Sequence, residues 1–524
     1  MNKEYDVIIV GGGITGAGCA RDLSLRGFKV LLVEKNDMAS GASGRNHGML
    51  HSGARYAVTD RESAEECIKE NRILRKIAAH CVDHTQGIFI TLPEDDLAYQ
   101  AKFVESCNAA GIEAQAIDPK LAIALEPSVN PSLIGAVTVP DGAVDPFRLC
   151  HYNLIDAKMH GAEVMTYTEV VSLIIEGGTV LGVRVYDKVH REKKEIRSRI
   201  VVNAAGVWGQ QIAAMAGCQI TMFPAKGSLL IFGHRVNNVL INRCRKPANA
   251  DILVPGDSIS LIGTTSTRVP LEECDDMRVT PEEVDILLTE GAKLAPVLAQ
   301  TRILRAYAGV RPLVASDDDP SGRNISRGIV LLDHQSRDGV GGFITITGGK
   351  LMTYRLMAEW TANLVSEKLG VASTCVTATT PLPGSEKKVA IDEKKTFAVK
   401  AMAGRMGTRA EKVKAEDMYS QALVCECEAV SVGEIEYALD NYQIDNLVDL
   451  RRRTRVGMGT CQGELCSCRA AGLVAKARGC AEKSKEDLKG FLEERYKGMY
   501  PTAWGDTLRE CEFIQDVYKD ICGL

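Results

Sequence analysis

Residues 5–34 read YDVIIVGGGITGAGCARDLSLRGFKVLLVE, and this stretch decides the fold. VIIV (7–10) is a short β-branched run, typical of a strand that is buried on both faces. Residues 14–27 carry helix-compatible apolar spacing that stops at Gly27, and VLLVE (30–34) predicts a second strand. The order of strand, glycine turn, helix and strand predicts a parallel α/β unit.

The glycine turn predicts a dinucleotide site. Gly11 permits the tight turn, Gly13 lets the backbone approach a pyrophosphate, and Gly16 lets the helix pack closely on the strand. The N-terminus of the helix then offers its N–H groups to the phosphates. Glu34 follows Gly16 by 18 residues, near the offset of about 20 expected for a ribose-binding carboxylate. The turn itself does not distinguish FAD from NAD.

Length and composition exclude several classes of protein. The chain has 524 residues, of which 45% are hydrophobic and 25% charged, as in an ordinary globular protein of several domains. The sequence shows no stretch of 18 apolar residues and no signal peptide, so we expect no transmembrane helix. The net charge of −5 makes a general nucleic-acid-binding role improbable.

Residues 40–56, SGASGRNHGMLHSGARY, favour FAD over NAD. This segment resembles the one that follows the FAD pyrophosphate to the isoalloxazine ring in glutathione-reductase-like flavoproteins. VVNAAGVWG (201–209) resembles their second cofactor-binding strand, and GGK (348–350) resembles the start of their last helix. Beyond the glycine turn and Glu34, the resemblance implies FAD contacts at Ser40, Ser43, Arg45, Asn46, His47, Ala205, Gly206, Gly348, Gly349, Lys350 and Leu351.

Several cations follow these segments and indicate an anionic substrate. Arg311 lies between Gly309 and Pro312 in YAGVRPL, where the backbone is stiff. Arginine binds a phosphate with two parallel charge-assisted hydrogen bonds, and lysine acts as a point charge. His51 is the histidine best placed to accept a hydroxyl proton. The candidate substrate-binding residues are Arg55, Tyr56, Arg311, Arg327 and Lys350, with His51 and Arg311 as catalytic candidates.

A group of cysteines near the C-terminus predicts a metal centre. Two pairs, Cys425 with Cys427 and Cys461 with Cys466, bring four soft thiolate donors together, which suits a [2Fe–2S] cluster or a structural zinc. The spacing resembles that of bacterioferritin-associated-ferredoxin-like [2Fe–2S] domains. Cys468 is an alternative fourth ligand, although we prefer Cys466. RRRTR (451–455), between the pairs, is either a solvated helix face or a basic element that offsets cluster charge or docks an acidic partner.

The chain as a whole resembles the catalytic A subunits of the anaerobic sn-glycerol-3-phosphate dehydrogenases. The motifs that carry the resemblance are GRNHGMLHSGARYAV, YAGVRPL, GGKLMTYRLMAEW, VCECE, DLRRRTRVGMGTCQGELC and AWGDTLRECEF. It implies FAD-dependent oxidation of sn-glycerol 3-phosphate to dihydroxyacetone phosphate, with electrons passed to a quinone. It also implies two partners, one a second flavoprotein subunit, the other an iron–sulfur membrane-anchor subunit. The expected location is cytoplasmic, on the inner face of the membrane.

The expected architecture is a glutathione-reductase-like FAD-binding Rossmann domain interleaved with a mixed-sheet substrate domain, followed by a small helical cluster domain. We expect the oxidoreductase unit at 1–375, with FAD-binding segments near 1–80, 140–220 and 300–370. A linker with a helix (376–420), the [2Fe–2S] domain (421–475) and a helical tail (476–524) follow.

Three alternatives remain open from the residues. In the first, the same fold acts on another hydroxy acid, such as 2-hydroxyglutarate, or on an amino acid, because a substrate carboxylate also satisfies the cations. In the second, the chain is a non-catalytic protein that relays electrons between flavin and cluster. In the third, the chain is an oxidase that passes electrons directly to oxygen, a reaction for which the cluster is not needed.

Overall fold

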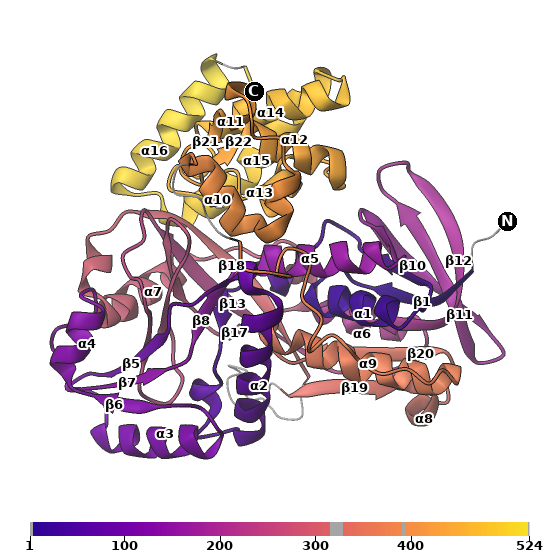
Figure 1. Ribbon diagram of the computed structural model, residues 1–524, viewed down its shortest axis with the longest axis horizontal. Helices are drawn as coiled ribbons and strands as arrows, with labels where there is room; N and C mark the ends of the chain where they lie inside the picture. The colour runs from indigo at the N-terminus through magenta and orange to yellow at the C-terminus, as the bar shows by residue number, and fades with distance from the viewer. Residues whose placement is uncertain (1–3, 315–327, 390–394, 522) are drawn as a thin grey trace.

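The computed structural model describes residues 4–314, 328–389, 395–521 and 523–524. Two lobes, each built on its own β-sheet, lie side by side, and the C-terminal helices sit together above them (Figure 1). None of the helices within the described ranges combines the length and the apolar character needed to cross a bilayer.

The first lobe is built on the glycine-turn sheet. Its strands β9, β2, β1, β12 and β20 run parallel, and β10 and β11 extend the sheet as an antiparallel hairpin against the first half of β12. The strand bounds are β1 Glu4–Val10, β2 Val30–Val33, β9 Glu163–Met165, β10 Thr168–Glu176, β11 Thr179–Asp187, β12 Glu192–Asn203, β19 Ile329–Asp333 and β20 Phe343–Gly348.

Helices cover this sheet because its central strands are apolar on both faces. All four residues of β2 are buried, as are the last four of β1. Helix α1 packs against both α5 and α9, and their apolar side chains form one core with the sheet. The helices of the first lobe are α1 Ile14–Leu25, α2 Arg61–Ile77, α5 Pro146–Met159, α6 Gly209–Ala214, α8 His334–Asp338 and α9 Tyr354–Leu369.

The second lobe is a nine-stranded mixed sheet in which the long strands β13 and β18 pair antiparallel over most of their length. This pairing sets Arg311 opposite Ala225. The strands are β5 Gly87–Thr91, β6 Gln115–Ile117, β7 Gly135–Val139, β13 Met222–Phe232, β14 Leu240–Arg243, β15 Ile252–Pro255, β16 Ser260–Gly263, β17 Thr267–Arg268 and β18 Ile303–Val314. Its helices are α3 Leu97–Ala109, α4 Pro119–Leu125 and α7 Pro281–Leu294.

A small sheet of three strands connects the two lobes. Strand β8 (Gly142–Val144) pairs with β3 (Met49–Leu50) and with β4 (Val82–Asp83). Because β3 lies between His47 and His51, this pairing anchors the segment that the sequence assigns to the flavin and substrate.

The C-terminal module has its own apolar core, in which Leu450, Val474 and Phe491 are buried. It contacts the first lobe through α13 on α5 and the second lobe through α15 on β18. The elements after α9 are α10 Phe397–Met406, α11 Met418–Gln421, β21 Leu423–Cys425, β22 Val430–Ser431, α12 Val432–Asn441, α13 Leu447–Thr454, α14 Cys466–Arg478, α15 Glu482–Met499 and α16 Gly505–Gln515.

The predicted fold class is confirmed: a Rossmann-type α/β lobe is interleaved with a mixed-sheet lobe and followed by a small helical module. The segment VVNAAGVWG (201–209), which resembles a second cofactor-binding strand, begins in the last residues of β12. The segment 300–370 divides between the lobes, because β18 belongs to the second sheet.

Candidate functional site

The glycine turn has the form of a phosphate cradle. Gly11 has a φ of +114°, and a Cβ atom there would lie 2.6 Å from the Ala204 carbonyl oxygen. A Cβ atom on Gly16 would lie 1.9 Å from the Gly11 carbonyl oxygen, so both positions require glycine. Helix α1 has Gly13 as its N-cap, without a side-chain cap, and its first turn carries no acidic residue. The helix end therefore suits an anion.

Glu34 directly follows β2 and contacts the glycine turn. Its carboxylate accepts hydrogen bonds from the Gly12 N–H at 2.6 Å and from the Asn36 N–H at 2.8 Å. Burial raises the pKa of Glu34, and the two backbone donors oppose this shift. Ala205 and Gly206 follow β12 directly, and the Ala204 N–H donates to the Val10 carbonyl oxygen at 2.9 Å. The predicted adenosine end of the cofactor site thus comes together from three segments.

A cavity of about 250 Å³, here the flavin cavity, gathers most of the other predicted residues. Segments of the first lobe, which include the turn before α9, and strands β13 and β18 of the second lobe contribute to its wall. The predicted residues that line it are Ser43, Arg45, Asn46, His47, His51, Arg55, Tyr56, Arg311, Gly348, Gly349, Lys350 and Leu351.

Arg311 is held by a cage of oxygen atoms on the second sheet. Its guanidinium donates to the Thr265 carbonyl oxygen at 3.2 Å, the Lys226 carbonyl oxygen at 3.4 Å and the Ser266 hydroxyl at 3.4 Å, and also to Thr264. A Cβ atom on Gly227 would lie 2.6 Å from Arg311 Nη2, so glycine makes room for the guanidinium. These carbonyl and hydroxyl oxygen atoms fix the orientation of the guanidinium on the second sheet.

The remaining predicted substrate residues lie around His51. The His51 ring is 5.7 Å from that of His47 and 5.7 Å from that of Tyr56. Lys350 Nζ lies 4.7 Å from the centre of the Tyr56 ring. Arg55 Nη2 donates to Asp251 at 3.0 Å, and its buried Nη1 has no hydrogen-bond partner among the described residues. The cavity wall therefore combines two imidazoles, a phenol ring and four cations, which are Arg45, Arg55, Arg311 and Lys350.

Some predicted residues lie elsewhere. Arg327 lies outside the described residues. Arg355, a further cation of GGKLMTYR, is buried in ion pairs with Glu70 at 2.6 Å and Glu359 at 2.6 Å, so it is a structural residue and not part of the cavity wall. Ser40 lines a neighbouring cavity.

The four predicted thiols lie together in the C-terminal module. Cys425 ends β21, Cys466 begins α14, and Cys427 and Cys461 lie on the intervening loops. Hydrogen bonds from the thiols of Cys427 and Cys466 lower the pKa of Cys461. The Cys425 thiol likewise interacts with Cys466, and the Gly457 and Glu428 N–H groups point at its sulfur. N–H donors directed at sulfur stabilise thiolates, and this donor set fits a thiolate-ligated metal centre.

The spread of the four sulfur atoms suits two iron atoms better than one zinc. Tetrahedral zinc with Zn–S bonds of about 2.3 Å brings all four sulfur atoms to about 3.8 Å from one another. Among the described residues, no three of these thiols lie mutually within 4.8 Å. Cys468 points elsewhere, since its side chain interacts with Tyr518.

RRRTR (451–455) is not a solvated helix face, so that expectation is wrong. Arg453 Nη2 donates to Asp37 at 2.6 Å and Arg452 Nη1 donates to Asp37 at 2.8 Å, across the boundary with the first lobe. Asp37 is only 1% exposed. The basic run thus docks an acidic residue of its own chain.

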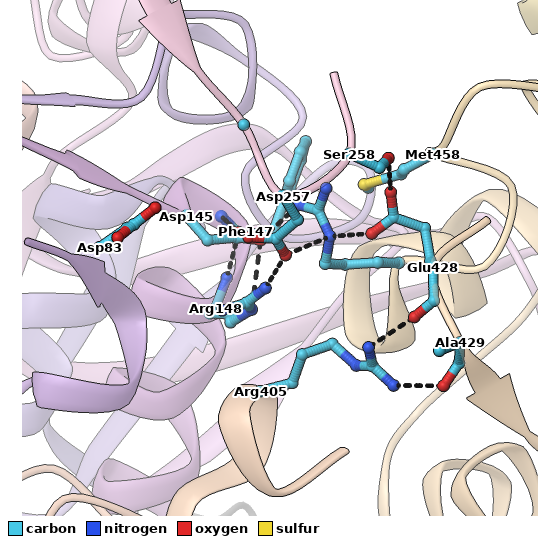
Figure 2. A network of polar contacts seen from close by, with 12 residues as sticks. Asp83, Asp145, Phe147, Arg148, Asp257, Ser258, Arg405, Glu428, Ala429 and Met458 are labelled. Atoms are coloured by element: carbon cyan, nitrogen blue, oxygen red, sulfur yellow. Dashed lines mark hydrogen bonds and ion pairs between the residues drawn. The ribbon is translucent and has the colours of Figure 1, made fainter. Parts of the chain in front are cut away.

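Arg455 extends this network to the second lobe. It donates to Asp145 at 2.7 Å and to Glu428 at 2.7 Å, and pairs with Asp257 at 3.0 Å. Figure 2 shows Arg148 between Asp145 and Asp257, and Ser258 donating to Glu428 beside the cysteine loop. Because Glu428 directly follows Cys427, these ion pairs tie the metal centre to both lobes.

Sequence reasoning missed the residues that orient the site. Asp251 holds Arg55 from 196 positions away, and Asp141 accepts the Ser52 N–H at 2.6 Å from 89 positions away. Asn71 donates to the His51 carbonyl oxygen at 3.1 Å. Motif spacing carries no signal for such partners, because each lies on a different element.

The residues present fit both prosthetic groups suggested by the sequence. Glycine-only positions, a helix end without an acidic residue in its first turn and a buried carboxylate fit a dinucleotide, and the adjoining cavity has walls of mixed polarity for a ring system. Four thiols with backbone N–H donors fit an iron–sulfur cluster.

Comparisons with known proteins agree with this geometry. Residues 6–355 match the FAD dependent oxidoreductase family, and residues 423–476 match the BFD-like [2Fe-2S] binding domain. The A subunit of the anaerobic glycerol-3-phosphate dehydrogenase of Escherichia coli (strain K12) is 62% identical over 100% of this chain and 98% of its own length. The corresponding A subunit of Haemophilus influenzae is 60% identical over 99% of this chain and 93% of its own.

Solved structures share the fold. The glycerol-3-phosphate dehydrogenase of Bacillus halodurans, complexed with FAD, superposes with a TM-score of 0.67 over 95% of each chain at 22% identity. The L-α-glycerophosphate oxidase of Mycoplasma pneumoniae, with FAD bound, has a TM-score of 0.58 at 20% identity, over 71% of this chain and 96% of its own.

Proposed function

The chain belongs to the FAD-dependent oxidoreductase family and, within it, to the family of the anaerobic glycerol-3-phosphate dehydrogenase A subunits, and from this premise we propose that it oxidises sn-glycerol 3-phosphate to dihydroxyacetone phosphate. It is an FAD-dependent enzyme that also carries a [2Fe–2S] domain. The observation that carries the proposal is the flavin cavity, where the predicted substrate residues Arg55, Arg311, Lys350 and His51 line the same wall as the predicted cofactor segments.

In this proposal the cations bind the substrate phosphate. Arg311 is oriented by carbonyl and hydroxyl oxygen atoms, and a guanidinium offers two parallel charge-assisted donors to a phosphate. Arg55 is partly neutralised by Asp251 but keeps one buried Nη atom without a partner among the described residues. Lys350 adds a point charge beside Tyr56. A phosphate monoester matches this set better than a single carboxylate, which carries only one negative charge.

His51 is the proposed base. Its imidazole is 8% exposed and takes the proton of the C2 hydroxyl as the C2–H bond breaks. Asn71 fixes the backbone of His51, and Asp141 fixes that of the next residue, so the imidazole is presented from a rigid loop. FAD, when bound, supplies the hydride acceptor at N5, which the chain itself lacks.

The [2Fe–2S] domain suggests an outlet for electrons. The cluster, when bound, carries one electron at a time. We propose that electrons leave through it to a second flavoprotein subunit, then to an iron–sulfur membrane-anchor subunit, which passes them to a quinone. The chain would then lie at the inner face of the cytoplasmic membrane through those partners.

Anaerobic spectroscopy tests the proposal. We expect sn-glycerol 3-phosphate to bleach the flavin absorbance of the purified holoprotein, with 2-hydroxyglutarate and proline as comparison substrates. Bleaching by 2-hydroxyglutarate or proline alone would assign the site to a carboxylate substrate. No bleaching by any of them would make the chain an electron relay, and peroxide formed in air at the rate of turnover would make it an oxidase.

A further inference from the structure

A second cavity, of about 340 Å³, lies where the C-terminal module meets the two lobes. We name it the arginine cavity. It shares Arg45, Asn46 and His47 with the flavin cavity, but includes no residue of the glycine turn at 11–16 or of the segment at 348–351. Its wall adjoins that of the flavin cavity but includes none of the proposed substrate-binding residues Arg55, Arg311 and Lys350. Its charged residues are Arg45, Asp83, Asp145, Arg148, Asp257, Arg305, Arg451, Arg452, Arg455 and Glu494.

Two buried arginines in its wall each have an Nε atom without a hydrogen-bond partner among the described residues. Arg305 is 9% exposed and Arg451 is 8% exposed. The Nε atom of each is buried without a hydrogen-bond partner, and the described residues offer neither guanidinium an ion pair. Their neighbours are aromatic rings, Tyr307 at 6.0 Å from Arg305 and Phe491 at 5.9 Å from Arg451. Buried cations are normally paired, so these two indicate a missing anion.

The other charges of the cavity are already satisfied. Arg148 and Arg455 pair with Asp145 and Asp257, and Arg452 pairs with Asp37. Asp83 lies beside Arg235 at 3.3 Å. These pairs leave three guanidinium groups, of Arg45, Arg305 and Arg451, facing one carboxylate, Glu494.

Glu494 does not neutralise this group. No ion pair within 4.0 Å joins it to an arginine in the described part of the chain, although Arg451, Arg305 and Arg45 lower its pKa against the effect of burial. Burial, together with repulsion by Arg305, lowers the pKa of Arg451 to about 9. Burial also lowers the pKa of Arg45. The cluster thus carries an excess of about two positive charges when all three arginines and Glu494 are ionised, which a dianion would balance.

We propose that the arginine cavity binds a phosphate monoester, with its dianionic phosphate between Arg45, Arg305 and Arg451. Arginine suits phosphate because its planar donors make parallel charge-assisted bonds. The cavity exceeds the size of a phosphate, and its remaining wall includes Phe147, Ile259 and Leu261, so an apolar or aromatic body fits beside the phosphate. The site is distinct from the proposed substrate site and does not depend on that assignment.

Calorimetric titration of the FAD- and cluster-loaded protein with inorganic phosphate tests the proposal. We expect one class of phosphate-binding site that persists in the Arg311→Gln variant, in which phosphate binding in the flavin cavity is weakened. Arg305→Gln and Arg451→Gln should each weaken this class at least tenfold. Arg469→Gln is the matched control, because Arg469 is an exposed arginine paired with Glu426 in the same module.

Glu494→Gln provides a test that does not depend on removing a buried arginine. The substitution removes the negative charge that interacts with all three arginines, so phosphate should bind several-fold more tightly. The proposal is wrong if Glu494→Gln leaves phosphate affinity unchanged, if the arginine variants bind phosphate as the parent does, or if Arg311→Gln abolishes all binding. Variant folding is checked by the flavin and cluster spectra.

Competition distinguishes the source of the phosphate. If sn-glycerol 3-phosphate displaces inorganic phosphate from the Arg311→Gln protein, the cavity takes a second molecule of the substrate class. If adenosine 5′-monophosphate displaces it and sn-glycerol 3-phosphate does not, the cavity takes a nucleotide-like ester with an aromatic body. If neither displaces it, the cavity binds an inorganic anion and the monoester assignment is wrong.

Discussion

The cysteine centre and the flavin cavity differ in how their residues are distributed along the chain. The four cysteines fall between Cys425 and Cys466, on two loops of one small module. The flavin cavity takes residues from Ile14 to Leu351, on both lobes. Local spacing therefore constrains the first site strongly, whereas the second depends on strand pairing and on long-range ion pairs.

The largest effect is expected at the cysteine centre. Cys466→Ser removes a thiol adjacent to both Cys425 and Cys461 and should abolish cluster assembly. Cys468→Ser is the matched control two residues away, and should retain iron and sulfide because Cys468 points toward Tyr518. Iron and acid-labile sulfide per chain, with the electron paramagnetic resonance spectrum of the reduced protein, report both variants. The opposite pattern would make Cys468 the ligand.

Arg311→Ala tests the flavin cavity. Loss of a charge-assisted phosphate contact is expected to lower kcat/KM for sn-glycerol 3-phosphate by about 10²- to 10³-fold, or roughly 3–4 kcal/mol. Steady-state kinetics measure this effect. Arg184→Ala is a control, because Arg184 is an exposed residue paired with Glu195 on β11 and β12. An unchanged KM and kcat in Arg311→Ala would remove Arg311 from the substrate site.

Asp37→Asn tests the connection between the two regions. It removes the shared acceptor of Arg452 and Arg453 and leaves two poorly paired arginines, which we expect to destabilise module docking by about 3 kcal/mol. Glu426→Gln, at the exposed pair with Arg469, should cost less than about 1 kcal/mol. Limited proteolysis and thermal unfolding compare the two variants. Equal stability would show that the ion pairs do not hold the module.

Docking of the C-terminal module onto the first lobe should also depend on pH. Burial favours the neutral form of Asp37, but Arg453 and Arg452 outweigh this effect and lower the pKa of Asp37 in the folded protein. Its contribution to stability is therefore complete above the unfolded pKa of about 4 and is lost as the pH falls through the lower, folded value. Thermal unfolding of the parent should lose more stability below pH 4 than that of Asp37→Asn. Parallel pH profiles would contradict the assignment.

The smallest effect is expected at the glycine turn. Glu34→Gln keeps one carbonyl acceptor for the Gly12 or Asn36 N–H but loses the charge, so FAD should bind about tenfold more weakly, or roughly 1.4 kcal/mol. Fluorescence titration of the apoprotein with FAD measures this. Glu195→Gln, at an exposed pair on the same lobe, is the control. Unchanged FAD affinity would mean that Glu34 stabilises the glycine turn and does not contribute to FAD binding.

Sequence patterns predicted the regular parts of the fold and the residue types of the site. Strands β1 and β2 followed from apolar runs, and helix α1 followed from its glycine turn and its end near Gly27. Arg355 shows the limit of this approach. It lies in the same motif as Lys350, yet it is buried in ion pairs with Glu70 and Glu359. The spacing of residues within the motif does not distinguish these two cations.

Sequence patterns alone were enough to predict the glycine turn, the strands and helix around it, and the four cysteines, because each depends on residues that are neighbours along the chain. The folded arrangement was needed to show which arginines are neutralised and which face a cavity. Arg452 and Arg453 meet Asp37 across more than 400 positions, whereas Arg451, beside them on α13, meets no carboxylate within ion-pair distance among the described residues. Charge in a protein interior is set by what folding brings within a few ångströms, which sequence distance does not encode.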